Sequence, residues 1–226
     1  MLSRKMNCFM PLLVLVVQPA FAAKDDRTAV FRMVGTEFTM RLPEGYCLPE
    51  GKANDVAQLL AAADNVNVTH LTAVRCHSVA DPAALTDYIL LKSPKVALTT
   101  IIGREMLVKT MGVEFDKPEF LSALNLDKMN GEVSTALSNV FNQKVNIDGQ
   151  IQPLGKDAAC AFLGGTISIK GLQGEYKSSM GGCITSVSDR VLVLYWYGPD
   201  KGAAGVADLI VKVRGLVERI EGKPAN

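Results

Sequence analysis

Four cysteines, Cys47, Cys76, Cys160 and Cys183, limit the possible folds of this sequence more than any other residues do. A fifth, Cys8, lies in an N-terminal segment that we expect to be removed. An even number of cysteines in an exported chain indicates disulfides. We therefore expect two bridges, each contributing about 3 kcal/mol to stability by restricting the unfolded chain.

The first 22 residues follow the three-part pattern of a signal peptide. Arg4 and Lys5 precede an apolar run over 8–17, and the small-x-small triplet Ala20-Phe21-Ala22 supplies the cleavage site. The run has about half the length of a membrane-spanning helix, which needs roughly 20 residues. We predict cleavage after Ala22, a periplasmic or secreted location, and no integral membrane segment after cleavage.

Cleavage leaves the mature chain close to neutral. The whole sequence has 24 Lys plus Arg and 23 Asp plus Glu, so the loss of Arg4 and Lys5 leaves 22 basic against 23 acidic residues. Nucleic-acid binding normally requires a basic surface, and adhesion to anionic membranes requires clustered Lys and Arg. We expect neither kind of partner. A mature chain of about 200 residues can bury one sizeable core, which predicts a single domain over 23–226.

A predicted hairpin suggests how the cysteines pair. Residues 158–169 and 176–187 have the composition of strands and flank a segment rich in turn residues. A hairpin centred just after Gly171 places Cys160 directly opposite Cys183, within reach of a bridge. The remaining two cysteines then pair with each other.

Two glycine pairs, at 164–165 and 181–182, lie in the same hairpin. The predicted register sets position 164 opposite 179 and position 165 opposite 178, so that the two pairs are offset. Glycine in a strand often marks a bulge or the close approach of another backbone. We favour relief of strand twist over a close approach here.

Strands and helices alternate in the first half of the chain. The periodicity of apolar residues predicts strands over 29–42 and 68–76 and a helix over 53–63. Asp81 and Pro82 predict the start of another helix, because Asp caps free amides and Pro fits the first helical position. We expect Tyr88 and Ile89 on the buried side of this helix and Pro94 at its end.

In the second half, helices precede an antiparallel meander. The pattern between 104 and 141 is helical with repeated starts, one of which has the spacing of a capping box. Predicted strands follow at 145–151, 158–169, 176–187 and 191–197. The last strand is apolar on both faces, which indicates a central position in a sheet. An amphipathic helix with a stripe from Val206 to Ile220 follows.

This order predicts an α+β fold, in which an antiparallel sheet carries a C-terminal amphipathic helix and a helical insertion at about 104–141. The strand Phe38–Leu42 runs into Pro43-Glu44-Gly45 and then into a helix. Together with the late meander and the final helix, this pattern resembles the PsbP-like sandwich of exported proteins. The resemblance implies an accessory protein that binds a partner and has no catalytic groups.

The sequence contains no recognisable catalytic or metal-binding motif. His70 and His77 are the only histidines, and two are too few for a zinc site of three or four ligands. The sequence also lacks a nucleophile elbow, a zinc-protease helix and a phosphate loop. We expect no metal and no cofactor, and any catalytic residues are unknown. The alternatives are an exported hydrolase whose site forms only in the folded chain, and a structural protein of the outer surface.

The helical insertion carries the best candidate for a binding surface. Its apolar residues include Met106, Met111, Phe115, Phe120 and Met129. Methionine adapts to irregular partners, although an apolar helical face more often belongs to the core. We predict that this surface contacts a protein partner or a small apolar ligand.

Overall fold

The computed structural model describes residues 27–78, 86–124, 126–171 and 174–225. The predicted signal peptide and the predicted helix start at Asp81 lie outside these ranges. The elements of the first half are β1 (Thr28–Met33), β2 (Thr36–Arg41), β3 (Tyr46–Cys47), α1 (Gly51–Ala63), β4 (Asn67–Arg75), η1 (Cys76–Ser78), β5 (Tyr88–Pro94) and η3 (Lys95–Ala97). Those of the second half are α2 (Arg104–Phe115), α3 (Phe120–Leu124), α4 (Leu126–Phe141), β6 (Asn146–Lys156), β7 (Ala161–Gly171), β8 (Gly174–Val187), β9 (Arg190–Pro199), α5 (Gly202–Val217) and β10 (Ile220–Pro224).

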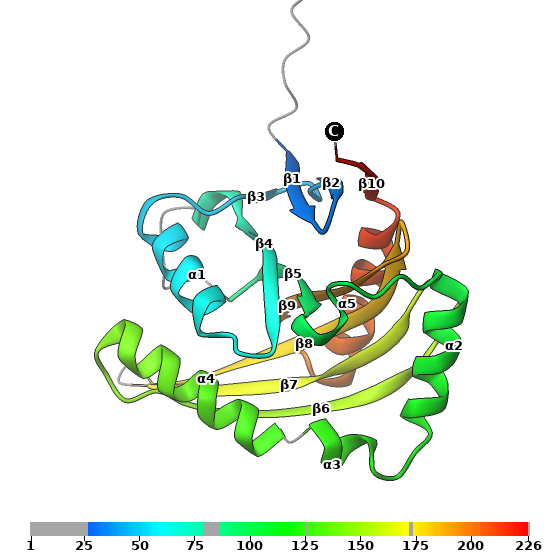
Figure 1. Cartoon of the computed structure of the whole chain (residues 1–226). Coiled ribbons are helices and arrows are strands. Elements are labelled where there is room, and N and C mark those ends of the chain that lie inside the picture. Colours follow the sequence, from blue (N-terminus) through cyan, green and yellow to red (C-terminus); the bar gives the residue numbers. More distant parts are fainter. Residues whose placement is uncertain (1–26, 79–85, 125, 172–173, 226) are drawn as a thin grey trace, which may run out of the picture.

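All the paired strands are antiparallel and form two sheets. The larger sheet has the order β3-β4-β5-β9-β8-β7-β6, and the smaller has the order β1-β2-β10. In Figure 1 the long strands β6, β7 and β8 curve between α2 at one end and α4 at the other, and β1, β2 and β10 lie together above them. The predicted α+β class is confirmed, and the insertion at 104–141 is helical. Among the described residues, no helix is both long and apolar enough to cross a membrane.

The two faces of the larger sheet have different covers. One face, which we call the α5 face, carries Gly181 and Cys183 of β8 and packs against α5 and the smaller sheet. The opposite face, which we call the insertion face, carries Met180 and Gly182 of β8. On this side, Ser186 Oγ donates a hydrogen bond of 2.6 Å to the carbonyl that lies two residues before α2. The larger sheet is therefore a middle layer with the main core on its α5 face.

Residues Tyr88–Pro94 form strand β5, so the helix predicted there is wrong. Ile89, Leu91 and Ser93 are fully buried and alternate with partly exposed residues, which is the period of a strand. Pairing with both β4 and β9 supplies the backbone hydrogen bonds of this central strand. The apolar spacing that favoured a helix comes from its first residues alone.

The C-terminal helix ends at Val217, three residues before the predicted end of its apolar stripe. Ile220 instead begins β10 and lies opposite Met40 of β2. The missed strand is short and contains Gly222 and Pro224, which weaken any strand signal in the sequence. Its backbone is satisfied by pairing with a strand from the other end of the chain.

The predicted cysteine pairing is present, although the predicted hairpin register is wrong by two residues. Cys183 lies opposite Phe162, and Cys160 precedes β7. Because side chains alternate with period two, a shift of two keeps a residue on the same face. The Cys160–Cys183 bridge therefore still forms, with Sγ atoms 2.06 Å apart, and Cys47 bonds to Cys76 at 2.03 Å.

The corrected register sets Gly164 directly opposite Gly181, whereas Gly165 lies opposite Met180, so the two pairs overlap by one glycine each. A Cβ atom at Gly181 would lie 2.7 Å from the carbonyl carbon of Leu209 and 2.9 Å from the nitrogen of Ile210. The backbone of α5 thus passes directly over β8. These glycines permit a close approach of helix to sheet, and relief of twist is not their main role.

Helix α4 runs along the outer edge of β6. Asn130, Ser134 and Ser138 follow one another at four-residue spacing and therefore lie on one side of the helix. Ser138 Oγ accepts the N–H of Val145 at 2.9 Å, and Ser134 Oγ accepts the N–H of Ile147 at 2.8 Å. The insertion thus supplies side-chain partners to backbone N–H groups at the start of β6 and just before it.

Candidate functional site

Three tyrosines from two adjacent strands lie together on the insertion face. Tyr195 and Tyr197 belong to β9, and Tyr88 of β5 is directly opposite Tyr197. The rings of Tyr88 and Tyr197 stack with centroids 4.4 Å apart, and the Tyr195 centroid is 6.3 Å from that of Tyr197. Gly182, opposite Tyr195, leaves room for its ring, since a Cβ there would lie 3.2 Å from ring carbons. We call Tyr88, Tyr195 and Tyr197 the tyrosine cluster.

The hydroxyl groups of the tyrosine cluster take no part in the hydrogen bonding of the described residues. All three side chains are half-buried, and within the described part of the chain none of these hydroxyls has a hydrogen-bond partner. Burial raises the pKa of Tyr195 to about 12 and also raises the pKa of Tyr88 and of Tyr197. The neutral phenols can each donate and accept a hydrogen bond. The cluster therefore combines apolar rings with polar tips, as many ligand sites do.

A half-buried ion pair borders the tyrosine cluster. Lys92, on the same face of β5, donates from Nζ to Asp64 Oδ2 at 2.7 Å. Burial opposes ionisation of Asp64, but the Lys92 bond and two backbone N–H groups outweigh it and lower the pKa of the carboxyl. The negative charge adds to the rise in the pKa of Tyr195. The site thus has an apolar floor and one charged border whose two ions are paired with each other.

The candidate surface predicted from the sequence is only partly assembled. Met106 is 61% exposed, whereas Met111, Phe115 and Phe120 are half-buried. Phe115 and Phe120 meet edge to face with centroids 4.8 Å apart, across the turn between α2 and α3. The side chain of Met129 lies outside what the structure describes. Binding by these residues stays a prediction.

The insertion also exposes apolar side chains that the sequence analysis did not select. Val113 of α2 and Leu121 of α3 are exposed, and Val113 follows Met106 by two helical turns. Residues seven apart lie on the same side of a helix. We call Met106 and Val113 the α2 stripe.

One serine–histidine pair bears on the hydrolase alternative. His70 Nε2 lies 3.0 Å from Ser93 Oγ, as in a nucleophile–base pair. However, Ser93 is fully buried, and its hydroxyl donates to the carbonyl of Val191 at 2.8 Å. Burial lowers the pKa of His70, whose ring stacks on Phe31. His70 and Ser93 lie within the core between the sheets, and this geometry supports a structural role.

A second polar group, on the α5 face, is fully engaged. Tyr46 donates its hydroxyl hydrogen to Asp87 and accepts the indole N–H of Trp196 at 2.9 Å. Arg75 Nε bonds to Asp87 Oδ2 at 2.7 Å, and its guanidinium lies 4.5 Å from the centre of the Tyr46 ring. Burial, followed by the contact with Asp87, raises the pKa of Tyr46. These groups satisfy one another and leave none for a ligand.

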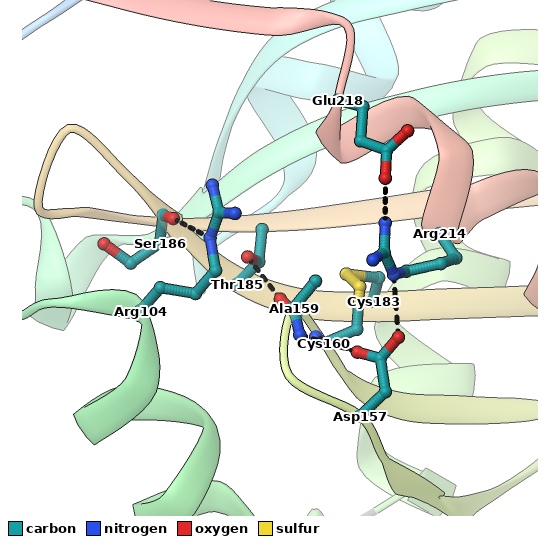
Figure 2. The surroundings of a disulfide bond; sticks show 9 residues. All are labelled: Arg104, Asp157, Ala159, Cys160, Cys183, Thr185, Ser186, Arg214 and Glu218. Carbon is teal, nitrogen blue, oxygen red and sulfur yellow. Dashed lines mark hydrogen bonds and ion pairs between the residues drawn. A yellow bond between two sulfur atoms is a disulfide. The ribbon is translucent and has the colours of Figure 1, made fainter.

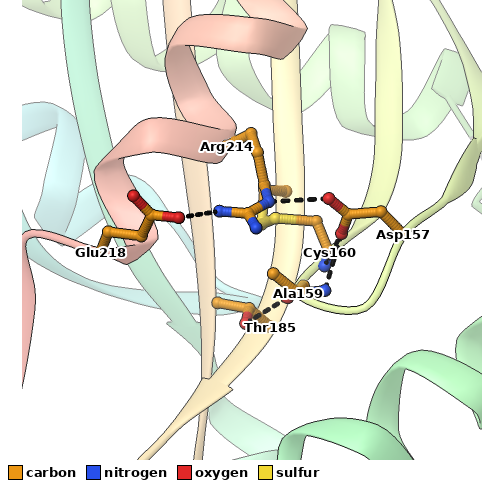
Figure 3. Close-up of polar contacts among 7 residues, drawn as sticks. Asp157, Ala159, Cys160, Thr185, Arg214 and Glu218 are labelled. Atoms are coloured by element: carbon orange, nitrogen blue, oxygen red, sulfur yellow. Dashed lines mark hydrogen bonds and ion pairs between the residues drawn. A yellow bond between two sulfur atoms is a disulfide. The ribbon is translucent and has the colours of Figure 1, made fainter.

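The Cys160–Cys183 bridge is also enclosed by internal contacts (Figures 2 and 3). Asp157 accepts the N–H of Cys160 at 2.7 Å and a hydrogen bond from Arg214 Nε at 2.7 Å. Arg214 also donates to Glu218 at 2.8 Å, so that it links two carboxylates. This network attaches α5 to the turn between β6 and β7 and gives the disulfide a structural role. Among the described residues, no group of three or more His, Cys, Asp or Glu could hold a metal ion.

The tyrosine cluster was missed in the sequence for two reasons. Tyr195 and Tyr197 stand two residues apart in a run that is apolar on both faces, so they attracted no attention as polar groups. Tyr88 was assigned to a helix, which hid its place beside them. Two tyrosines at alternate positions of a predicted central strand were the available signal.

No protein-family model matches the chain, and no curated protein matches it in sequence. Among solved structures, the solution structure of the cyanobacterial PsbP (CyanoP) from Synechocystis sp. PCC 6803 matches 87% of this chain and 92% of its own, with a TM-score of 0.37 and 8% identity. The chain therefore has a weak PsbP-like resemblance.

Proposed function

We propose that this chain is an exported, non-catalytic binding protein that holds a small apolar ligand on the tyrosine cluster, in the periplasm or outside the cell. The observation that carries this proposal is the set of three half-buried tyrosines whose hydroxyls have no partner within the described residues. Among the described residues, no buried side-chain oxygen lacks a hydrogen-bond partner, so these unpartnered hydroxyls reach solvent and are accessible to a ligand. Two disulfides support an oxidising compartment.

The chemistry of the cluster selects the class of ligand. Stacked rings favour a flat or aliphatic body, and neutral phenols favour carbonyl, ether or hydroxyl groups. The Asp64–Lys92 pair has no net charge, so it offers little attraction to an ion. A neutral molecule with an apolar body and a few oxygen atoms fits best.

Mass spectrometry of the protein purified from its own export compartment tests this proposal. Under native conditions we expect extra mass that denaturation releases. The denatured mass should show cleavage after Ala22 and the loss of four hydrogens for two disulfides. A wild-type protein that carries no extra mass would contradict ligand binding, and an intact N-terminus would contradict export.

Two variants locate the ligand on the tyrosine cluster. Tyr195→Phe combined with Tyr197→Phe keeps both rings and removes two free hydroxyls, so we expect at least tenfold lower occupancy in native spectra. Tyr176→Phe is the matched control, because the Tyr176 hydroxyl already donates to the carbonyl of Thr86 at 3.0 Å. Equal loss in both proteins would place the ligand elsewhere.

A protein partner is the second candidate, and the exposure of the α2 stripe favours it. Met106→Glu introduces a charge into this stripe without touching the tyrosine cluster. If the purified protein is bare but co-purifies with one stoichiometric partner that Met106→Glu releases, the partner function replaces the ligand function.

A further inference from the structure

Strand β1 presents an open edge to its surroundings. The N–H of Leu42 donates to the carbonyl of Arg27 at 2.7 Å, which shows that odd-numbered residues of this strand face β2. The N–H and C=O groups of Thr28, Val30 and Arg32 therefore face away from β2. Within the ranges that the structure describes, these six groups have no partner.

The other long edges of the two sheets are partly covered. Along β6, α4 contributes its serines and the amide of Asn130, which donates to the carbonyl of Gly149 at 3.4 Å. Further along β6, Pro153 has no N–H to expose. On β10, Ser188 donates to the outward carbonyl of Gly222 at 3.1 Å. Proteins generally block edges in these ways, since an open edge attracts other strands.

A groove lies beside the open edge, between β1, α1 and β4. Its volume is about 260 Å³, and its apolar lining comprises Ala29, Val30, Leu48, Pro49, Ala57 and Ala61. Val30 is 59% exposed and Leu48 is exposed as well. The lining also includes Leu71 and the polar side chains of Asn54, Gln58, Thr69, His70 and Thr72. Its limited volume suits small side chains.

We propose that β1 and this groove bind an extended segment of a partner polypeptide, which adds a fourth strand to the smaller sheet. Only an extended backbone supplies alternating donors and acceptors to the six free groups of Thr28, Val30 and Arg32. Small apolar side chains at alternate positions of the segment would enter the groove. Because α1 walls the groove on the far side, there is room for one strand rather than for the sheet of a second copy. This site is separate from the tyrosine cluster, so either proposal can fail alone.

Amide hydrogen exchange measured by NMR tests the proposal with a defined probe. The probe is an acetylated and amidated hexapeptide of alternating threonine and alanine. We expect the exchange of the Thr28, Val30 and Arg32 amides to slow at least tenfold. The same peptide methylated on alternate backbone nitrogens should leave their exchange unchanged, because it lacks the donors that face β1.

Two protein variants complete the test. Val30→Pro removes one outward N–H and should weaken peptide binding at least tenfold, whereas Val30→Thr keeps the N–H and should bind as the wild type does. The proposal is overturned if the unmodified peptide protects no β1 amide or if the methylated peptide protects them equally. It is also overturned if the free protein is a dimer in which these amides are already protected.

Discussion

The two faces of the seven-stranded sheet use tyrosine in opposite ways. On the α5 face, Tyr46 is enclosed and its hydroxyl joins Asp87 and Trp196. On the insertion face, Tyr195 and Tyr197 are half-buried and their hydroxyls have no partner in the described residues. The same side chain therefore stabilises the fold on one face and remains available on the other. We propose that one side of the sheet serves stability and the other side serves binding.

The largest difference should appear at two adjacent glycines of β8. Gly181→Ala places a Cβ against the backbone of α5, and overpacking of this kind should lower the free energy of unfolding by about 3 kcal/mol. Gly182→Ala is close only to the Tyr195 ring, which can move, and makes an ordinary contact with Leu163, so its cost should be about 1 kcal/mol or less. Urea denaturation measures both values. Equal costs would mean that α5 adjusts easily and that the two faces are equally tolerant.

Removal of a single hydroxyl should give a smaller difference between the two faces in the free energy of unfolding. Tyr46→Phe leaves the Asp87 carboxylate and the Trp196 indole without their shared partner, which should cost about 2 kcal/mol. Tyr197→Phe removes a hydroxyl that has no protein partner, so its cost should be within about 0.5 kcal/mol. Thermal unfolding of the two variants measures both losses of stability. A large loss in Tyr197→Phe would reveal a hidden structural role for the cluster.

The covered edge of β6 gives a smaller effect. Ser138→Ala deprives the Val145 N–H of its acceptor and should cost about 1 kcal/mol. Ser122→Ala is the control, because its hydroxyl only donates to a carbonyl within the insertion and touches no strand. Urea denaturation should detect the first loss and little from the second. Peptide binding at β6 in Ser138→Ala, measured as for β1, would show that the serine also guards the edge.

Ionisation of the tyrosines should have the smallest effect on stability near neutral pH. In alkali its effect on stability should be large. Burial is the leading cause that raises the pKa of all five above the ordinary value of 10.0. The folded state therefore binds more protons than the unfolded state above pH 10, and stability falls as pH rises from there. Below pH 10 this contribution is fully present. Ultraviolet titration of phenolate should show ionisation of the urea-unfolded chain near pH 10 and a later transition in the folded protein.

The periodicity of apolar residues predicted much of the fold. The predictions were wrong where pairing between strands that are distant in sequence determines the structure. The predicted cysteine pairing was right although the predicted register was wrong, because a shift of two residues keeps each side chain on the same face of a strand. Strand β5 was missed because one of its two partners, β9, is remote in sequence, so that its central position could not be seen from its own residues. The tyrosine cluster depends on that strand, so Tyr88 could not be placed beside Tyr197 from the sequence. The edge contacts of α4 were equally invisible, since serine in a helix carries no signal for a strand.

The pairing of β2 with β10 also has a consequence for the order of folding. Met40 lies opposite Ile220, so the smaller sheet joins strands from nearly opposite ends of the chain. A hairpin such as β1–β2 is marginally stable alone, and contacts between such distant residues form slowly. When the chain is synthesised from its N-terminus, the first strands cannot complete their sheet until the last helix and β10 have been made. Until then Phe31 and Phe38 stay exposed to water. The chain should therefore become stable late and in one step. Until the last helix is available, a holdase chaperone could bind the exposed strands.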